Sequence, residues 1–217
     1  MEEDKAGSGK LLEPIVTVGA TLLTNLLEPA SKELGELWGA MIKARRARLE
    51  RMCEGAGRLV QATGREPQVG PSRVLIPILE NGSLEDEDDN LTAKWVGLLA
   101  SAAAGDRVHS SYPKLLAELT PEEARMLDAI YQKFLEKGAE GEPARLAMPD
   151  LRALVNLPMK SFQIAVSNLS RLGLCAMPPI VGGISAVTFA SREVHFALTP
   201  LGEDFVATCQ GPRARDA

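Results

Sequence analysis

The chain has 217 residues, of which 45% are hydrophobic, 24% are charged and only 4% are aromatic, with a formal net charge of −5. This composition is typical of a globular protein with one or two domains, and it disfavours a β-sandwich, whose strands are enriched in aromatic and β-branched residues. The negative charge also disfavours a protein whose main role is to coat nucleic acid, because such binding depends on neutralising phosphates.

The N-terminal region has two parts. Residues 1–10 are acidic and contain glycine and serine, which predicts a disordered tail and differs from the basic start of a signal peptide. A helix is predicted over residues 11–27, and its stretch 14–27 carries no charge. A bilayer-spanning helix needs about 20 apolar residues, so a transmembrane span is not predicted. Packing of the leucines onto the next helix is favoured, and insertion into a membrane surface is the alternative.

Residues 29–63 predict one long helix, because no proline interrupts them after Pro29, and Gly64 is the predicted C-cap. An apolar stripe recurs along this helix at three- and four-residue steps. Its members are Leu34, Trp38, Met41, Leu49, Met52, Ala56 and Leu59.

The same helix carries a dense basic cluster, which we call the basic cluster from here on: Lys43, Arg45, Arg46, Arg48 and Arg51. Such a cluster is usually a solvated helix face, but it also predicts a partner-binding face for phosphate, lipid head groups or an acidic protein. A third interpretation pairs it with the acidic run at residues 85–89 within the helical domain.

A helical hairpin is predicted next. A helix over residues 72–80 leads into a turn at 81–83, and five consecutive acids open a second helix over residues 85–104. Acids in a first helical turn interact favourably with the helix dipole. The run lacks the spacing of an EF-hand, so a metal site is not predicted. One apolar face of the second helix consists of Leu91, Trp95, Leu98 and Ala102.

The pattern changes after residue 119. Thr120 to Glu123 form a capping box with proline at the first helical position. Helices over residues 148–155 and 158–172 follow, then two strands over 174–181 and 187–198 joined around Gly182-Gly183, and a last helix from Pro200. This order resembles a winged helix-turn-helix.

The predicted fold class is therefore mainly α, an N-terminal helical domain followed by a winged helix-turn-helix-like α+β domain. The predicted boundaries are residues 1–10 for a disordered tail, 11–115 for the helical domain, 116–209 for the winged-helix-like domain and 210–217 for a mobile tail.

In a winged helix the third helix enters the DNA major groove. Residues 119–205 hold eight Lys and Arg against ten Asp and Glu, so a protein-binding or structural role is favoured over DNA contact. The candidate contacts on this helix are Lys160, Gln163, Ser167, Ser170 and Arg171.

No catalytic residue, cofactor site or metal site is predicted, and the protein is not expected to be an enzyme. His109 and His195 stand alone, and no G-x-S-x-G, G-x-G-x-x-G or Walker A motif occurs. The cysteines Cys53, Cys175 and Cys209 are widely spaced and form no Cys-x-x-Cys pair, which predicts free thiols in a reducing cytosol.

Several motifs occur in an order that resembles the abortive infection alpha family of bacterial phage-defence proteins. The resemblance covers roughly residues 30–205, and its motifs are Lys32–Leu37, Leu79-Glu80-Asn81, Ser83-Leu84-Glu85-Asp86, Trp95 with Leu98-Leu99-Ala100, and Leu119-Thr120-Pro121. We call Glu80, Asn81, Ser83, Glu85, Asp86 and Trp95 the family motif. The resemblance implies anti-phage defence without a recognised catalytic motif.

Our hypothesis is a cytoplasmic abortive infection protein that acts by recognising a macromolecule, most simply a host or phage protein. Two alternatives remain open: a winged-helix transcription regulator that binds DNA, and a toxic effector that acts on membranes through residues 11–27. The sequence permits a homo-oligomer but does not require one.

Overall fold

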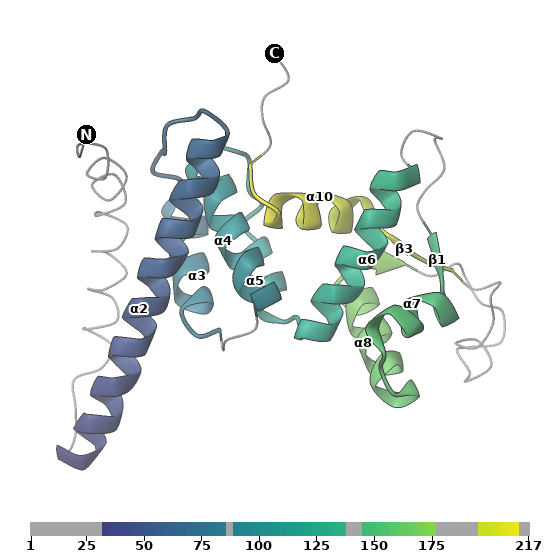
Figure 1. The fold of residues 1–217 in the computed structure, drawn as a ribbon, viewed down its shortest axis with the longest axis horizontal. Coiled ribbons are helices and arrows are strands. Elements are labelled where there is room, and N and C mark those ends of the chain that lie inside the picture. Colours follow the sequence, from purple (N-terminus) through teal and green to yellow (C-terminus); the bar gives the residue numbers. More distant parts are fainter. Residues whose placement is uncertain (1–31, 86–88, 138–144, 177–194, 213–217) are drawn as a thin grey trace, which may run out of the picture. The chain divides into compact units, whose positions relative to one another are not determined.

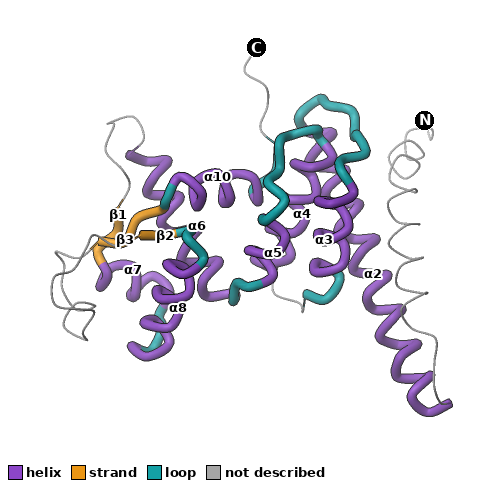
Figure 2. Tube along the Cα trace, turned by 180° about the vertical axis from the view of Figure 1, so that it is seen from behind, coloured by secondary structure: helices purple, strands orange, loops and turns teal. Residues whose placement is uncertain are grey.

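A computed structural model describes four stretches of the chain, residues 32–85, 89–137, 145–176 and 195–212. Within them the protein is mainly helical, as predicted, with eight helices and one sheet of three short strands (Figures 1 and 2). Several predictions fall outside these stretches: those for residues 1–31, for Asp86, for Gly182-Gly183 and for residues 213–217.

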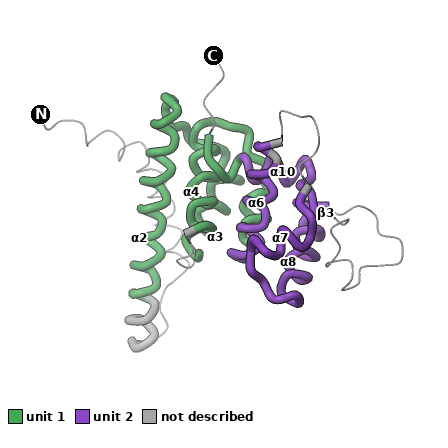
Figure 3. Tube along the Cα trace, turned by 45° about the vertical axis from the view of Figure 1, so that its right-hand side comes forward, with its two compact units in different colours: residues 1–117, 208–217 green, residues 118–207 purple. Residues whose placement is uncertain are grey.

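The chain divides into two compact units (Figure 3). Unit 1 comprises residues 1–117 together with 208–217, and unit 2 comprises residues 118–207. The predicted division placed the boundary after residue 115 and assigned residues 208 and 209 to the second domain.

The described helices of unit 1 are α2 (Lys32–Ala62), α3 (Ser72–Gly82), α4 (Asp89–Ala103) and α5 (Tyr112–Ala117). The long helix α2 ends as predicted, because Gly64 adopts a φ of 70° and its amide donates to the carbonyl of Gln61. Only glycine takes up this left-handed conformation at little cost.

The core of unit 1 lies where the second half of α2 packs against α4 (Figure 1). The predicted face of α4 is confirmed, since all four of its residues are buried. On α2 the predicted stripe is wrong at two positions, because Met41 and Leu59 are exposed. Among its described residues, the hydrophobic side chains that α2 does bury are Leu49, Met52, Cys53, Ala56 and Val60.

The two errors have different causes. At the C-terminal end of α2 the stripe advances by four residues from Ala56 to Val60, which leaves Leu59 at the edge of the core side, about 100° round the helix from Val60. Met41 instead lies in the first half of α2, before Leu49, which is the first buried side chain from Gly39 onward.

The last helix, α10 (Pro200–Cys209), ends against α4. Ser101 on α4 donates its hydroxyl to the carbonyl of Thr208 at 2.8 Å. One turn earlier on α4, a β-carbon added at Gly97 would overlap the carbonyl oxygen of Cys209. The chain after Thr208 therefore lies directly on the α4 backbone, and glycine at position 97 permits this approach.

Unit 2 begins with α6 (Pro121–Lys137), followed by β1 (Arg145–Ala147), α7 (Met148–Val155), α8 (Met159–Arg171), β2 (Cys175–Ala176) and β3 (His195–Leu198). The helix predictions for 148–155 and 158–172 are confirmed. Strand β3 lies between β1 and β2 and is antiparallel to both, with Leu146 opposite Phe196 and Cys175 opposite Leu198.

The predicted hairpin strands are confirmed where the structure describes them, at 175–176 and 195–198. Strand β1 was not predicted, because three residues are too few to show an alternating pattern. The helices and β3 enclose one apolar core, whose fully buried members include Leu127, Ile130, Phe162, Phe196 and Phe205.

Candidate functional site

The family motif begins at the C-terminal end of α3. Asn81 donates from its side-chain amide to the carbonyl of Pro77 at 2.9 Å. The hydroxyl of Ser83 donates to the carbonyl of Glu80 at 2.7 Å, and the Ser83 side chain is fully buried. The bond from Ser83 satisfies one of the carbonyl groups that a helix leaves without partners at its end.

Two arginines of the basic cluster on α2 bind this same turn. Arg45 donates to the hydroxyl of Ser83 from Nε at 3.3 Å and from Nη2 at 3.1 Å, and Arg48 donates to the Ser83 carbonyl at 3.4 Å. Burial lowers the pKa of the Arg45 guanidinium, the carboxylate of Glu80 opposes that shift, and Arg48 adds to it. The contact thus joins α2 to the turn after α3.

The motif continues into α4 through its tryptophan. Trp95 is fully buried and donates from Nε1 to a carboxylate oxygen of Glu85 at 3.2 Å. A β-carbon at Gly82 would overlap the end of Met52 and lie 3.3 Å from the Trp95 ring. Ser83 and Trp95 of the family motif therefore belong to internal contacts that connect α2, α3 and α4.

The other members of the basic cluster are exposed. Lys43, Arg46 and Arg51 face solvent, and Arg46 forms a surface ion pair with Glu50 at 3.0 Å. Successive residues of an α-helix are separated by about 100°, so Arg46 lies well round the helix from Arg45. The basic cluster is thus dense in sequence but divided between an internal contact and a solvated surface.

The third helix of the predicted winged helix corresponds to α8. Four of its exposed residues recur at three- and four-residue steps and form an outward row, beside which Ser161 is also exposed: Lys160, Ile164, Ser167 and Arg171. Gln163 and Ser170, which were also predicted as contacts, are half-buried beside this row. Sequence analysis missed Ile164, although its side chain is 60% exposed at the middle of the row.

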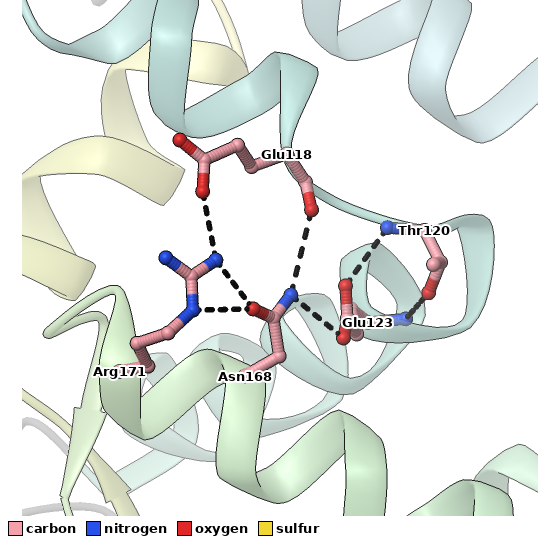
Figure 4. Close-up of polar contacts among 5 residues, drawn as sticks. All are labelled: Glu118, Thr120, Glu123, Asn168 and Arg171. Carbon is pink, nitrogen blue, oxygen red and sulfur yellow. Dashed lines mark hydrogen bonds and ion pairs between the residues drawn. The ribbon is translucent and has the colours of Figure 1, made fainter.

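Polar contacts hold the C-terminal end of this row (Figure 4). Arg171 forms an ion pair with Glu118 at 2.7 Å and donates to the side-chain oxygen of Asn168 from both Nε and Nη2. Asn168 in turn donates to a carboxylate oxygen of Glu123 at 2.9 Å. The guanidinium of Arg171 is therefore already engaged by oxygen acceptors within unit 2.

The predicted capping box supplies the other side of this network. The amide of Thr120 donates to Glu123 Oε2 at 2.8 Å, and the amide of Glu123 donates to the Thr120 hydroxyl at 3.3 Å. The capping box is confirmed, and its buried glutamate also binds α8 through Asn168 (Figure 4). No local pattern in the sequence indicates that second contact, because 45 residues separate Glu123 from Asn168.

The family model described as abortive infection alpha matches residues 42–209. The chain belongs to the abortive infection alpha family. A search of curated proteins and a search of solved structures gave no match. Abortive infection is a form of defence against phage, so the family suggests a role in that defence.

The residues matched by the family model cover most of both units. It includes the cluster that joins Arg45, Ser83 and Trp95, and it ends at Cys209, the last residue of α10. The match to the abortive infection alpha family thus covers the Arg45–Ser83 contact of unit 1 and all of unit 2. It also covers Thr208, which binds Ser101 on α4.

The remaining candidate groups of this abortive infection alpha protein were also located. All three cysteines are buried and free, and burial raises the pKa of Cys53 to about 11, an effect that Glu50 and Glu54 increase. His109 contacts Ser111 at 2.7 Å, next to the start of α5, and His195 is half-buried on β3. Among the described residues, no three His, Cys, Asp or Glu side chains gather as a metal site would require.

None of the described helices combines sufficient length with sufficient apolar character to cross a bilayer. Residues 11–27, for which membrane insertion was the alternative interpretation, lie outside the described stretches.

Proposed function

We propose that this abortive infection alpha protein acts in phage defence by binding another protein through the outward row of α8, and not by turning over a substrate. The observation that carries the proposal is the exposure of Ile164 at the middle of that row. An apolar side chain flanked by polar ones is typical of the centre of a protein-binding surface.

The arrangement of unit 2 supports a winged-helix binding module. Three helices, α6, α7 and α8, precede the β2–β3 pair, and β1 completes the sheet in the order β1-β3-β2. Helices α7 and α8 are joined by a turn at residues 156–158, in which Asn156 has a φ of 49°. A turn of three or four residues between two helices is characteristic of helix-turn-helix motifs.

The chemistry of α8 favours a protein partner over DNA. Lys160 and Arg171 are the basic residues of this helix, and Arg171 already forms an ion pair with Glu118. A DNA-reading helix needs cations for phosphates and polar side chains for base edges. Ile164 supplies neither, but it fits an apolar pocket on a protein. On α7, Leu154 is exposed to a similar degree, at 62%.

Replacement of Ile164 by glutamate is expected to abolish protection in a phage plating assay, because a charge at the centre of an apolar contact must be desolvated. The free energy of unfolding should change by no more than about 0.5 kcal/mol, since the side chain is exposed. Leu135→Glu is the matched control, because Leu135 lies on α6 of the same unit and is 52% exposed. Equal loss of protection in both variants would contradict the assignment to α8.

A DNA-binding regulator is the second candidate function, and the α7–turn–α8 geometry with Lys160 at the start of α8 favours it. A gel shift with duplex DNA at about 50 and 200 mM salt separates the two, because phosphate-dependent affinity falls steeply over this range. Salt-sensitive binding that Lys160→Ala weakens would support the regulator. Absence of binding, together with loss of protection in Ile164→Glu, supports the protein-binding function.

The exposed part of the basic cluster gives a separate prediction. We expect the triple change of Lys43, Arg46 and Arg51 to glutamate to leave protection in the plating assay unchanged, because these exposed side chains are spread over about 140° of the circumference of α2 and form no single patch. A change of Arg45 and Arg48 to glutamate should instead destabilise unit 1, because it removes the contacts to the Ser83 turn. Loss of protection in a folded triple variant would show that α2 has a partner-binding face.

A further inference from the structure

The turn between α7 and α8 (Figure 1) lies in a positive stretch of a chain whose net charge is −5. From the start of α7 to the end of α8 the sequence contains one acid, Asp150, and three cations, Arg152, Lys160 and Arg171. Asp150 lies in the first turn of α7, at the opposite end of that helix from the turn. The local charge therefore has the opposite sign to that of the whole chain.

Two of these cations bind acceptors of unit 2 itself. Arg171 forms its ion pair with Glu118, and Arg152 donates from Nε to the carbonyl of Leu157, within the turn, at 3.1 Å. Lys160 is different, because it is exposed and makes no hydrogen bond or ion pair to any residue that the structure describes. Lys160 is therefore the cation of α8 that remains available to a partner.

The start of α8 adds to the positive potential around Lys160. Pro158 at the N-cap makes no side-chain hydrogen bond to the helix, and the first turn contains no acidic residue. The first amides of a helix have no acceptor within the helix, and the helix dipole is positive at this end. The field at the start of α8 therefore favours a carboxylate beside Lys160.

Exposed apolar side chains lie on both sides of this cation in the sequence. Ile164 follows Lys160 by four residues on the outward row, which places their Cβ atoms about 5–6 Å apart. Leu154 is exposed on the last turn of α7, two residues before the turn begins. The surface thus offers a cation and an apolar contact within one helical turn of each other.

We infer that the protein bound by α8 presents an acidic amphipathic segment, with a carboxylate against Lys160 and an apolar side chain against Ile164. This inference rests on the proposed protein-binding role of α8 and adds the chemistry of the partner. Charge complementarity identifies the segment as acidic, because opposite potentials meet across protein interfaces. A nucleic acid backbone supplies anions, but it supplies no apolar side chain for Leu154 and Ile164.

A charge series at Lys160 in the full-length chain tests the inference. Lys160→Glu should lower protection in the phage plating assay at least about tenfold, because it places like charges opposite each other, whereas Lys160→Arg should retain protection. Lys114→Glu is the matched control. It makes the same change in net charge at an exposed lysine on α5, and it should retain protection.

Ser161→Asp separates binding from stability. Ser161 is exposed beside the row, and an acid in the first turn of α8 interacts favourably with the helix dipole. The melting temperature should therefore stay equal or rise, while protection falls because the new carboxylate repels an acidic segment. Ser161→Asn has the same shape without the charge and should retain protection. If this turn served only the stability of α8, protection would follow the melting temperature.

The possible failures are distinguishable. Retained protection in Ile164→Glu would overturn the protein-binding role itself. Loss in Ile164→Glu with retention in both Lys160→Glu and Ser161→Asp would overturn only the acidic partner, and so would equal losses in Lys114→Glu and Lys160→Glu.

Two other occupants give different results with purified protein. Salt-sensitive binding of duplex DNA that Ser161→Asp weakens would assign the surface to DNA. A wild-type dimer in sedimentation that Ile164→Glu dissociates would assign it to a second copy. Either result would overturn the acidic partner.

Discussion

Replacement of Trp95 by alanine is expected to lower the free energy of unfolding by about 3–5 kcal/mol, the usual cost of removing a buried aromatic side chain. Trp95 is fully buried on α4 and packs beside Gly82 at the turn after α3. Its loss leaves a cavity where α4 meets the end of α3 at Gly82 and the Met52 side chain of α2. Urea unfolding followed by circular dichroism at 222 nm measures the change.

Trp95→Phe separates packing from hydrogen bonding. Phenylalanine retains most of the volume but cannot donate to Glu85, so the expected cost is about 1–3 kcal/mol. Because Glu85 is only half-buried, water can replace part of the lost bond. A cost of Trp95→Ala no larger than that of Trp95→Phe would contradict the central packing role of the ring.

The local features of this fold could be predicted from the sequence. The helix expected over residues 148–155 has the same bounds as α7, and the capping box at Thr120 forms both of its hydrogen bonds. These features depend on residues close together in the sequence and on the helical repeat of 3.6 residues per turn. Both can be read directly from a single sequence.

The long-range contacts could not be predicted in the same way. Arg45 and Ser83 are 38 residues apart, and the interpretation that paired the basic cluster with residues 85–89 took the neighbouring acids, not Ser83, as its partner. The basic cluster looked like one surface because its members are close in sequence. Tertiary packing decides which side of α2 is buried, and it removed Arg45 and Arg48 from the surface that Lys43 and Arg46 occupy.

Two residues of the family motif lie in the core of unit 1. Ser83 and Trp95 are buried, and their hydrogen-bond partners lie within unit 1. Because both residues hold the core together, a chain with this fold needs them at these positions in the sequence. The candidate binding row on α8 contains Ile164, which lies outside that motif and was absent from the sequence-based list. An exposed isoleucine cannot be distinguished from a buried one until the packing of α8 is known.

Replacement of Gly97 by alanine is the second change with a large expected effect. A β-carbon at this position would overlap the Cys209 carbonyl oxygen and would lie 2.7 Å from the carbonyl carbon of Cys209 and 3.0 Å from the amide nitrogen of Gly211. These are backbone atoms, so no side-chain rotation relieves the overlap. We expect a loss of about 1–3 kcal/mol in the free energy of unfolding, with faster hydrogen exchange in residues 208–212.

Gly39→Ala is the matched control, because it makes the same chemical change within another helix of unit 1. No atom lies within 4 Å of a β-carbon at Gly39, so alanine should instead stabilise α2 by about 0.5–1 kcal/mol through its higher helix propensity. Both substitutions gain the same helix propensity. A loss of stability in Gly97→Ala and a gain in Gly39→Ala would therefore measure the cost of the steric overlap at position 97. Stabilisation by Gly97→Ala would mean that the chain after Thr208 can leave α4 at little cost. Destabilisation, together with exchange confined to residues 208–212, would show that this short segment is held on α4 by close backbone contact.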